Sequence, residues 1–191
     1  MVSSAPDVQW RIANTPDWAA CRGVFFNMLD QRATELGPEV RRQYLFSHPI
    51  SRFNPVRMYS LRDYIIRLAN LAKLGYADVN QGMFELQAMA FPAFRASILG
   101  RAWFAVFGLD LEGILKQMCG KLPSVLNCGT AEFHRRPHEI IVAFRGQYMP
   151  IDTALAGAVA GVARACRRVL PQRVELADAF NGDVILTGDA H

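Results

Sequence analysis

The sequence has no apolar run long enough to cross a membrane and no signal for export. A membrane-spanning helix requires about 18 or more uninterrupted apolar residues, and every apolar stretch of this 191-residue chain is interrupted sooner. The first ten residues, MVSSAPDVQW, have neither the basic start nor the apolar core of a signal peptide. We therefore expect a cytoplasmic protein without a membrane span.

Closely spaced cysteine pairs are missing as well. No CxxC motif occurs, and three of the four cysteines lie in apolar stretches typical of helices. Such a pattern favours buried, reduced thiols over a disulfide framework or a zinc site. We predict neither a metal nor a cofactor. The four residues are Cys21, Cys119, Cys128 and Cys166.

The motifs that mark common enzymes are also absent. There is no GxSxG elbow, no phosphate loop ending in GK and Ser or Thr, and no GxGxxG. Cys128 precedes His134 and His138 by six and ten residues, but spacing alone does not make a thiol and base pair. The formal net charge of +4 is spread along the chain and is too mild to predict nucleic-acid binding. We expect a non-catalytic protein, with an enzyme that leaves no local motif as an open alternative.

What the sequence does contain is one strongly apolar segment, FPAFRASILGRAWFAVF, at 91–107. Its apolar residues recur at three and four positions on most sides, which predicts a helix inside a domain. Pro92 suits the first turn of a helix, and Gly108 suits a helix end. We expect this central helix to lie within a single domain of residues 1–191.

The part from residue 1 to 128 is expected to be mostly helical. Its clearest signal is Ser60 followed by Asp63, a capping-box pattern, ahead of apolar residues at helical spacing. Val8, Trp10 and Ile12 alternate with other residues and predict a short strand instead. The expected elements are this strand and helices over 15–36, 39–46, 60–75, 79–90, 91–107 and 110–120.

The part from 129 to 191 is expected to contain the sheet. Residues 130–134 pair with 139–144 in one hairpin, and 174–176 pair with 184–186 in another, around the turn residues Asn181 and Gly182. Between them, a helix capped by Asp152 carries small residues that permit close packing on the sheet. The prediction is an α+β fold, in which the helical part packs on a small antiparallel sheet of two hairpins with a glycine-rich crossover helix.

Two groups of basic side chains lie in this second part, one at the tip of the first hairpin and one at the end of the crossover helix. They are either an ordinary polar turn and a helix end matched to its dipole, or a surface for an anion or acidic partner. A metal site would need a third imidazole, and only His48 in a loop and the terminal His191 remain. The candidates for a basic surface are His134, Arg135, Arg136, His138, Arg164, Arg167 and Arg168.

A family resemblance is carried by four segments, FRASILGRAWFAVFGLDLEGILKQM, LPSVLNCGTAEF, IIVAFRGQYMPIDTALAGAVAGV and VELADAFNGDVIL, within about Tyr59 to Leu186. In their order they resemble an uncharacterised paralogous family of small domains from myxobacteria. More distantly, the arrangement is similar to the haem-based nitric oxide and oxygen sensing domains and to the vinyl-reductase-like ligand-binding domains of bacterial regulators. This resemblance implies a helical subdomain over a small antiparallel sheet, with a ligand cavity between them.

The resemblance does not extend to haem. Those sensors place an axial histidine on a helix and hold the propionates with Tyr-x-Ser-x-Arg. This chain has no histidine in an expected helix, and its nearest run, FRGQY at 144–148, has the residues in another order. Cys119 could ligate iron as a thiolate, but a buried thiol is favoured.

We therefore expect a non-catalytic regulatory or sensory module that binds a small apolar ligand between the central helix and the sheet. The predicted lining is Tyr64, Phe94, Trp103 and Phe144, with Arg145 as a polar anchor. The alternative is a protein-interaction or scaffold component that acts through the basic surface, with a protein partner or a second copy of the chain.

Overall fold

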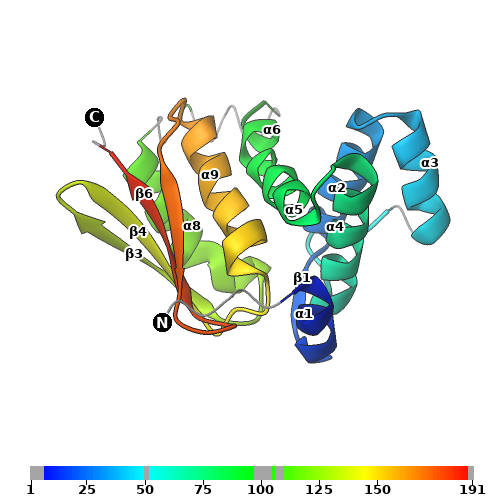
Figure 1. Cartoon of the computed structure of the whole chain (residues 1–191), viewed down its shortest axis with the longest axis horizontal. Coiled ribbons are helices and arrows are strands. Elements are labelled where there is room, and N and C mark those ends of the chain that lie inside the picture. The colour runs from blue at the N-terminus through cyan, green and yellow to red at the C-terminus, as the bar shows by residue number, and fades with distance from the viewer. Residues whose placement is uncertain (1–6, 50–51, 97–104, 106–109, 189–191) are drawn as a thin grey trace.

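The computed structural model describes residues 7–49, 52–96, 105 and 110–188, and it has the predicted α+β class (Figure 1). Helices fill the N-terminal part, and a four-stranded sheet lies in the C-terminal part. The described helices are α1 (Val8–Asn14), α2 (Gly23–Glu35), α3 (Pro38–Ser47), α4 (Leu61–Gly75), α5 (Val79–Ala88), α6 (Ala90–Ala96), α8 (Leu111–Val125), the π-helical turn η1 (Ile151–Leu155) and α9 (Ala156–Ala165). The strands are β1 (Ala20–Arg22), β2 (Met58–Ser60), β3 (Thr130–Arg136), β4 (Glu139–Arg145), β5 (Gln172–Leu176) and β6 (Gly182–Thr187).

The two predicted hairpins form one antiparallel sheet in the order β3-β4-β6-β5. The hairpins join through β4 and β6, where Ile140 lies opposite Leu186. The carboxylate of Asp178 closes the second turn by accepting hydrogen bonds from the N–H groups of Phe180 and Asn181, at 2.7 and 2.9 Å. The predicted sheet is therefore confirmed.

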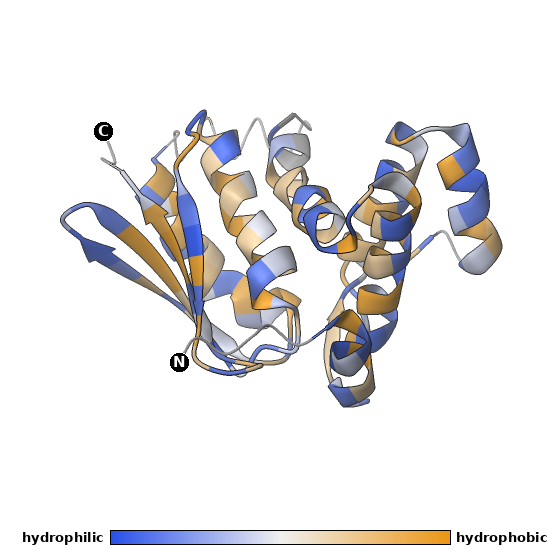
Figure 2. Cartoon of the chain, viewed as in Figure 1, coloured by the Kyte–Doolittle hydropathy of each residue, from blue (hydrophilic) through white to orange (hydrophobic). Residues whose placement is uncertain are grey.

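The elements are stacked in layers that begin at the sheet (Figure 1). Helices α8 and α9 lie next to the sheet, α5 and α6 follow, and α2, α4 and α3 lie farther away. Hydrophobic residues run along the middle strands and α9 (Figure 2). One cluster of buried residues extends from Phe26 and Leu68 in the helices to Phe144 and Val184 in the sheet. Burial of apolar surface is thus shared between the helical part and the sheet.

The crossover helix packs more closely on α5 than on the sheet, which corrects the prediction made from its glycines. A Cβ atom added at Gly157 would lie 2.2 Å from the carbonyl oxygen of Phe84, and one at Gly161 would lie 2.6 Å from that of Ala88. The missing side chains therefore allow the backbones of α5 and α9 to touch. Asp152 is not the cap residue, because Pro150 precedes the first turn of η1.

The predicted N-terminal strand is wrong, because residues 8–14 form α1. The side chain of Asp7 caps this helix by accepting the N–H of Trp10 at 2.7 Å. Arg11 is buried at 1% exposure, whereas Trp10 is 39% exposed, so the alternation of apolar residues did not reflect the buried face.

The expected helix over 15–36 is divided. Residues 20–22 form β1, which pairs with β2, and helix α2 begins only at Gly23. The side chain of Asn127, just after α8, fastens this region by accepting the N–H of Ala20 at 2.6 Å and donating to the carbonyl of Trp18 at 2.8 Å. Arg22 donates from Nε to the carbonyl of Ser124. We call these three bonds the Asn127 clasp.

One predicted helix matches the structure and another is longer than expected. Helix α4 begins as expected, with the hydroxyl of Ser60 accepting the N–H of Asp63 at 3.2 Å. Helix α8 continues past the predicted end at Gly120 to Val125 and contains Pro123. Of the expected central helix, α6 and residue 105 are described, and Ala105 is exposed.

None of the helices in the described part of the chain is long and apolar enough to cross a membrane.

Candidate functional site

An apolar cavity of about 370 Å³ lies between the helical part and the sheet. Helices α2, α4, α5, α6, α8 and α9 contribute to its wall, together with β4 and η1. This volume is within the range of sites for small molecules. The lining residues are Val24, Phe25, Met28, Tyr64, Gln87, Ala90, Phe91, Met118, Lys121, Leu122, Val125, Leu126, Phe144, Met149, Leu155 and Ala158.

All but three of these side chains are apolar, and two of the three exceptions bond to each other. Gln87 donates a hydrogen bond from Nε2 to the hydroxyl of Tyr64. Both residues are buried, and burial raises the pKa of Tyr64 above its ordinary value. The phenol is therefore neutral near pH 7. The third exception, Lys121, is exposed.

The structure brings together part of the predicted lining. Tyr64 and Phe144 face the cavity. Arg145 lies elsewhere, because its Nη1 donates to the carbonyls of Phe144 and Gly182 and to the carboxylate of Asp183, at 2.8, 3.1 and 2.8 Å. The side chain of Phe94 and the whole of Trp103 are outside what the structure describes.

Helix α8 supplies lining residues that sequence reasoning missed. Met118, Leu122 and Val125 follow at spacings of four and three residues, so they lie on one face of the helix. This spacing can be read from the sequence, but it predicts a shared helix face only if the helix continues through Gly120.

The cavity wall offers no imidazole and no thiol among the described residues. Over the same residues, no group of three or more His, Cys, Asp or Glu side chains is placed to hold a metal ion. The four cysteines are buried and unpaired with one another. Burial raises the pKa of Cys119 and of Cys166 to about 11, so their thiols are protonated near pH 7.

Several residues of the candidate basic surface are paired with carboxylates. Arg135 lies 2.8 Å from Glu112, Arg136 lies 3.7 Å from Glu139, and His134 lies 3.5 Å from Glu132. His138 is in the turn between β3 and β4.

One basic residue of the crossover helix, Arg164, is also paired with a carboxylate. Arg164 makes two bonds to Glu85, at 2.7 and 3.0 Å, which tie α9 to α5. This pair lowers the pKa of Glu85 through its hydrogen bonds. Arg167 has a positive φ of 61° just after the helix, and Arg168 follows it. The bonds of Arg164 thus serve the packing of two helices.

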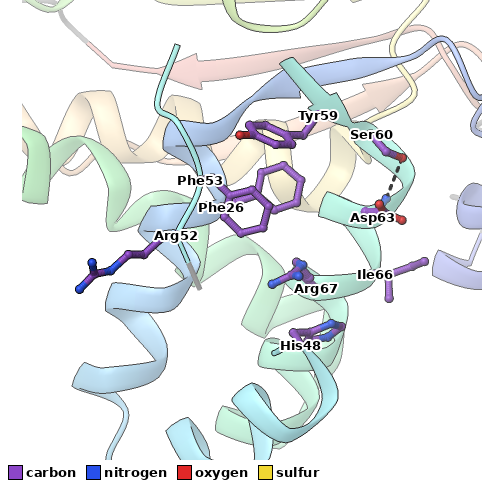
Figure 3. A pocket seen from close by; sticks show the side chains of 9 residues that line it. All are labelled: Phe26, His48, Arg52, Phe53, Tyr59, Ser60, Asp63, Ile66 and Arg67. Carbon is purple, nitrogen blue, oxygen red and sulfur yellow. Dashed lines mark hydrogen bonds between the residues drawn. The ribbon is translucent and has the colours of Figure 1, made fainter. Parts of the chain in front are cut away.

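A second cavity, also of about 370 Å³, lies in the helical part (Figure 3). Phe26 and Phe53 stack with ring centroids 4.4 Å apart, and the guanidinium of Arg67 lies 5.0 Å from the ring of Phe53. Figure 3 shows Arg67 between these rings and His48, while Arg52 points away from them. The wall holds both cationic side chains and the carboxylate of Asp63, so the cavity favours no ligand class. The lining residues are Phe26, His48, Arg52, Phe53, Tyr59, Ser60, Asp63, Ile66 and Arg67.

Comparison with solved structures identifies the architecture around the apolar cavity. The unliganded Fe(II) H-NOX protein from K. algicida matches 88% of this chain and 96% of its own, with a TM-score of 0.65 and 12% identity. The fold is that of H-NOX domains. A single-residue mutant of T. tengcongensis H-NOX matches 88% of this chain and 97% of its own, with a TM-score of 0.66 and 16% identity.

A third H-NOX structure, the S. oneidensis protein in the Fe(II)NO state, matches 88% of this chain and 99% of its own. Its TM-score is 0.63 and its identity 14%. No protein-family model matches the sequence, and no curated protein matches it. The likeness to H-NOX domains therefore concerns the fold.

Proposed function

We propose that this protein is a non-catalytic sensory or regulatory module of the H-NOX fold that binds a small apolar ligand. The observation that carries the proposal is the apolar cavity, whose wall is built by both the helical part and the sheet. A ligand there would contact both parts at once, and its binding energy could favour one arrangement of them. The single buried cluster supports one domain over residues 1–191. The cytoplasm is the proposed location, and the myxobacterial family is the proposed group of relatives.

The fold suggests haem, since one of the similar H-NOX structures concerns heme distortion. The residues of this chain do not fit that group. The described cavity wall has no His or Cys, and residues 97–109 contain no His, Cys, Met or Tyr. Met28, Met118 and Met149 are in the wall, but a methionine ligates haem together with a histidine, and the described wall has none. The hydroxyl of Tyr64 is bonded to Gln87 and its pKa is raised, which disfavours a phenolate ligand. The ligand we propose is therefore an organic molecule without iron.

The proposal is tested with 1-octanol as an uncharged apolar probe, by calorimetric titration at several temperatures. If the alkyl chain of octanol is buried in the cavity, binding should have a negative heat-capacity change. Ala158→Phe places a large side chain in the cavity and is expected to weaken binding at least tenfold. Ala160→Phe is the matched control, because Ala160 is a partly exposed residue of the same helix and does not line the cavity.

The outcomes separate clearly. Binding to the wild type and to Ala160→Phe, with loss in Ala158→Phe, supports the proposal. Absence of octanol binding to the wild type, or equal binding to both variants, would refute it.

A role as a protein-interaction component through the basic surface is the weaker proposal. Arg135, Arg136 and Arg164 already have carboxylate partners, so less positive charge is left for an acidic partner than the sequence suggests.

A further inference from the structure

The charge at the apolar cavity is of one sign. Among the described lining residues, Lys121 alone carries a charged side chain near pH 7, and its charge is positive. No acidic residue lines the cavity within the same described set. Lys121 is exposed, and its ammonium group forms no ion pair in the part of the chain that the structure describes. The apolar stem of Lys121 lines the wall, and its flexibility lets the ammonium group reach the mouth of the cavity.

The interior itself offers little to a polar head group. Its two polar side chains, Tyr64 and Gln87, are hydrogen-bonded to each other, and the other side chains of the interior are apolar. A charged group moved into this interior would lose its hydration without a compensating partner. A ligand that carries a charge must therefore keep it near Lys121 while its apolar part enters the cavity.

We propose, on the basis of the proposed function, that the ligand is an amphiphilic monocarboxylate with one acyl chain. The chain occupies the apolar cavity, and the carboxylate lies beside the ammonium group of Lys121. Lysine suits this role because its ammonium group is a compact, hydrated point charge with three N–H donors on a flexible stem. A head group at the exposed end of the site keeps its contact with water.

The experiment compares three probes that each carry an eight-carbon alkyl chain: nonanoate, 1-octanol and octyltrimethylammonium. At pH 7.5 the carboxyl group of nonanoate is ionised. The wild type is expected to bind nonanoate about two- to fivefold more tightly than octyltrimethylammonium, which is the range for one exposed charge pair. Lys121→Met should remove this preference, with 1-octanol binding measured in the same variant as the reference for the apolar site. Lys121→Glu should reverse it.

Lys116 gives a matched control on the same helix. Its Nζ lies 5.0 Å from the ring of Phe133, away from the cavity wall. Lys116→Met and Lys116→Glu change the net charge of the protein as the Lys121 variants do. They should leave the preference for nonanoate intact, because the effect depends on the position of the charge. Circular dichroism of each variant checks that the fold is retained.

The outcomes distinguish this inference from the function on which it rests. Binding of octanol without any preference among the three probes overturns the carboxylate inference and keeps the apolar site. The same holds for a preference that the Lys116 variants reduce as much as the Lys121 variants do. Failure of all three probes to bind overturns both. A preference that only the Lys121 variants abolish or reverse supports the assignment.

Discussion

Replacing Gly157 by alanine should destabilise the protein, although alanine is the better helix former. The new Cβ would lie 2.2 Å from the carbonyl oxygen of Phe84, which belongs to the backbone of α5 and cannot rotate away. Helices α5 and α9 would have to separate, and overpacking of this kind costs about 1–3 kcal/mol. Alanine gains about 1 kcal/mol over glycine in helix propensity. Because the clash is with backbone, the cost should lie near the upper end of this range, about 3 kcal/mol, which leaves a net loss of about 2 kcal/mol.

The assay is urea denaturation followed by circular dichroism. With a slope of about 2 kcal/mol per molar urea, the midpoint should fall by about 1 M. Gly120→Ala is the control, because a Cβ atom at Gly120 meets nothing within 4 Å and the residue is an exposed position of α8. That variant should be stabilised by up to about 1 kcal/mol. If the two variants change stability in the same direction, the close contact between α5 and α9 is refuted.

Two other predictions concern single carboxylates. Asp110 accepts the N–H groups of Glu112 and Gly113 at 3.2 and 3.0 Å, so Asp110→Ala should cost about 1 kcal/mol of unfolding free energy in the same assay, and Asp110→Asn much less. Burial raises the pKa of Asp30 to about 6. Between about pH 4 and 6, the folded protein therefore keeps a proton that the unfolded chain releases. Because the folded state binds more protons, the free energy of unfolding falls as the pH rises through this range. Asp30→Asn should therefore stabilise the protein by about 1–2 kcal/mol at pH 8, after allowance for partial exposure, and have no effect at pH 4. An equal effect at both pH values would contradict this account.

Local signals were sufficient for much of the fold. The capping pattern of Ser60 and Asp63 starts α4, and the turn residues before β6 close the second hairpin. The errors occurred where a distant partner decides the conformation. Cys21 pairs with Tyr59 and bridges to Leu126, and no pattern within residues 15–36 contains that information. A strand of three residues, such as β1, therefore cannot be predicted from a sequence segment whose overall pattern is helical.

Residues of the cavity lining could be predicted from the sequence where the helix or strand that carries them could be predicted. Tyr64 and Phe144 were found because α4 and β4 have clear periodicities. Arg145 was misplaced for a reason that the sequence contains, since neighbouring residues of a strand point to opposite faces. Lys121 and Leu122 were missed because Gly120 was taken as a helix end. Gly120 remains inside α8 in open surroundings.

The Asn127 clasp restricts how the cavity can change its size. It joins the residues just before α2 to the end of α8, and both helices carry parts of the wall, with Val24 and Phe25 on one and Lys121 and Leu122 on the other. Parallel separation of the two helices would break the clasp. To admit a larger ligand, α2 and α8 must therefore rotate apart about a hinge at Asn127. The separation would be greatest at the ends of the two helices that lie farthest from Asn127.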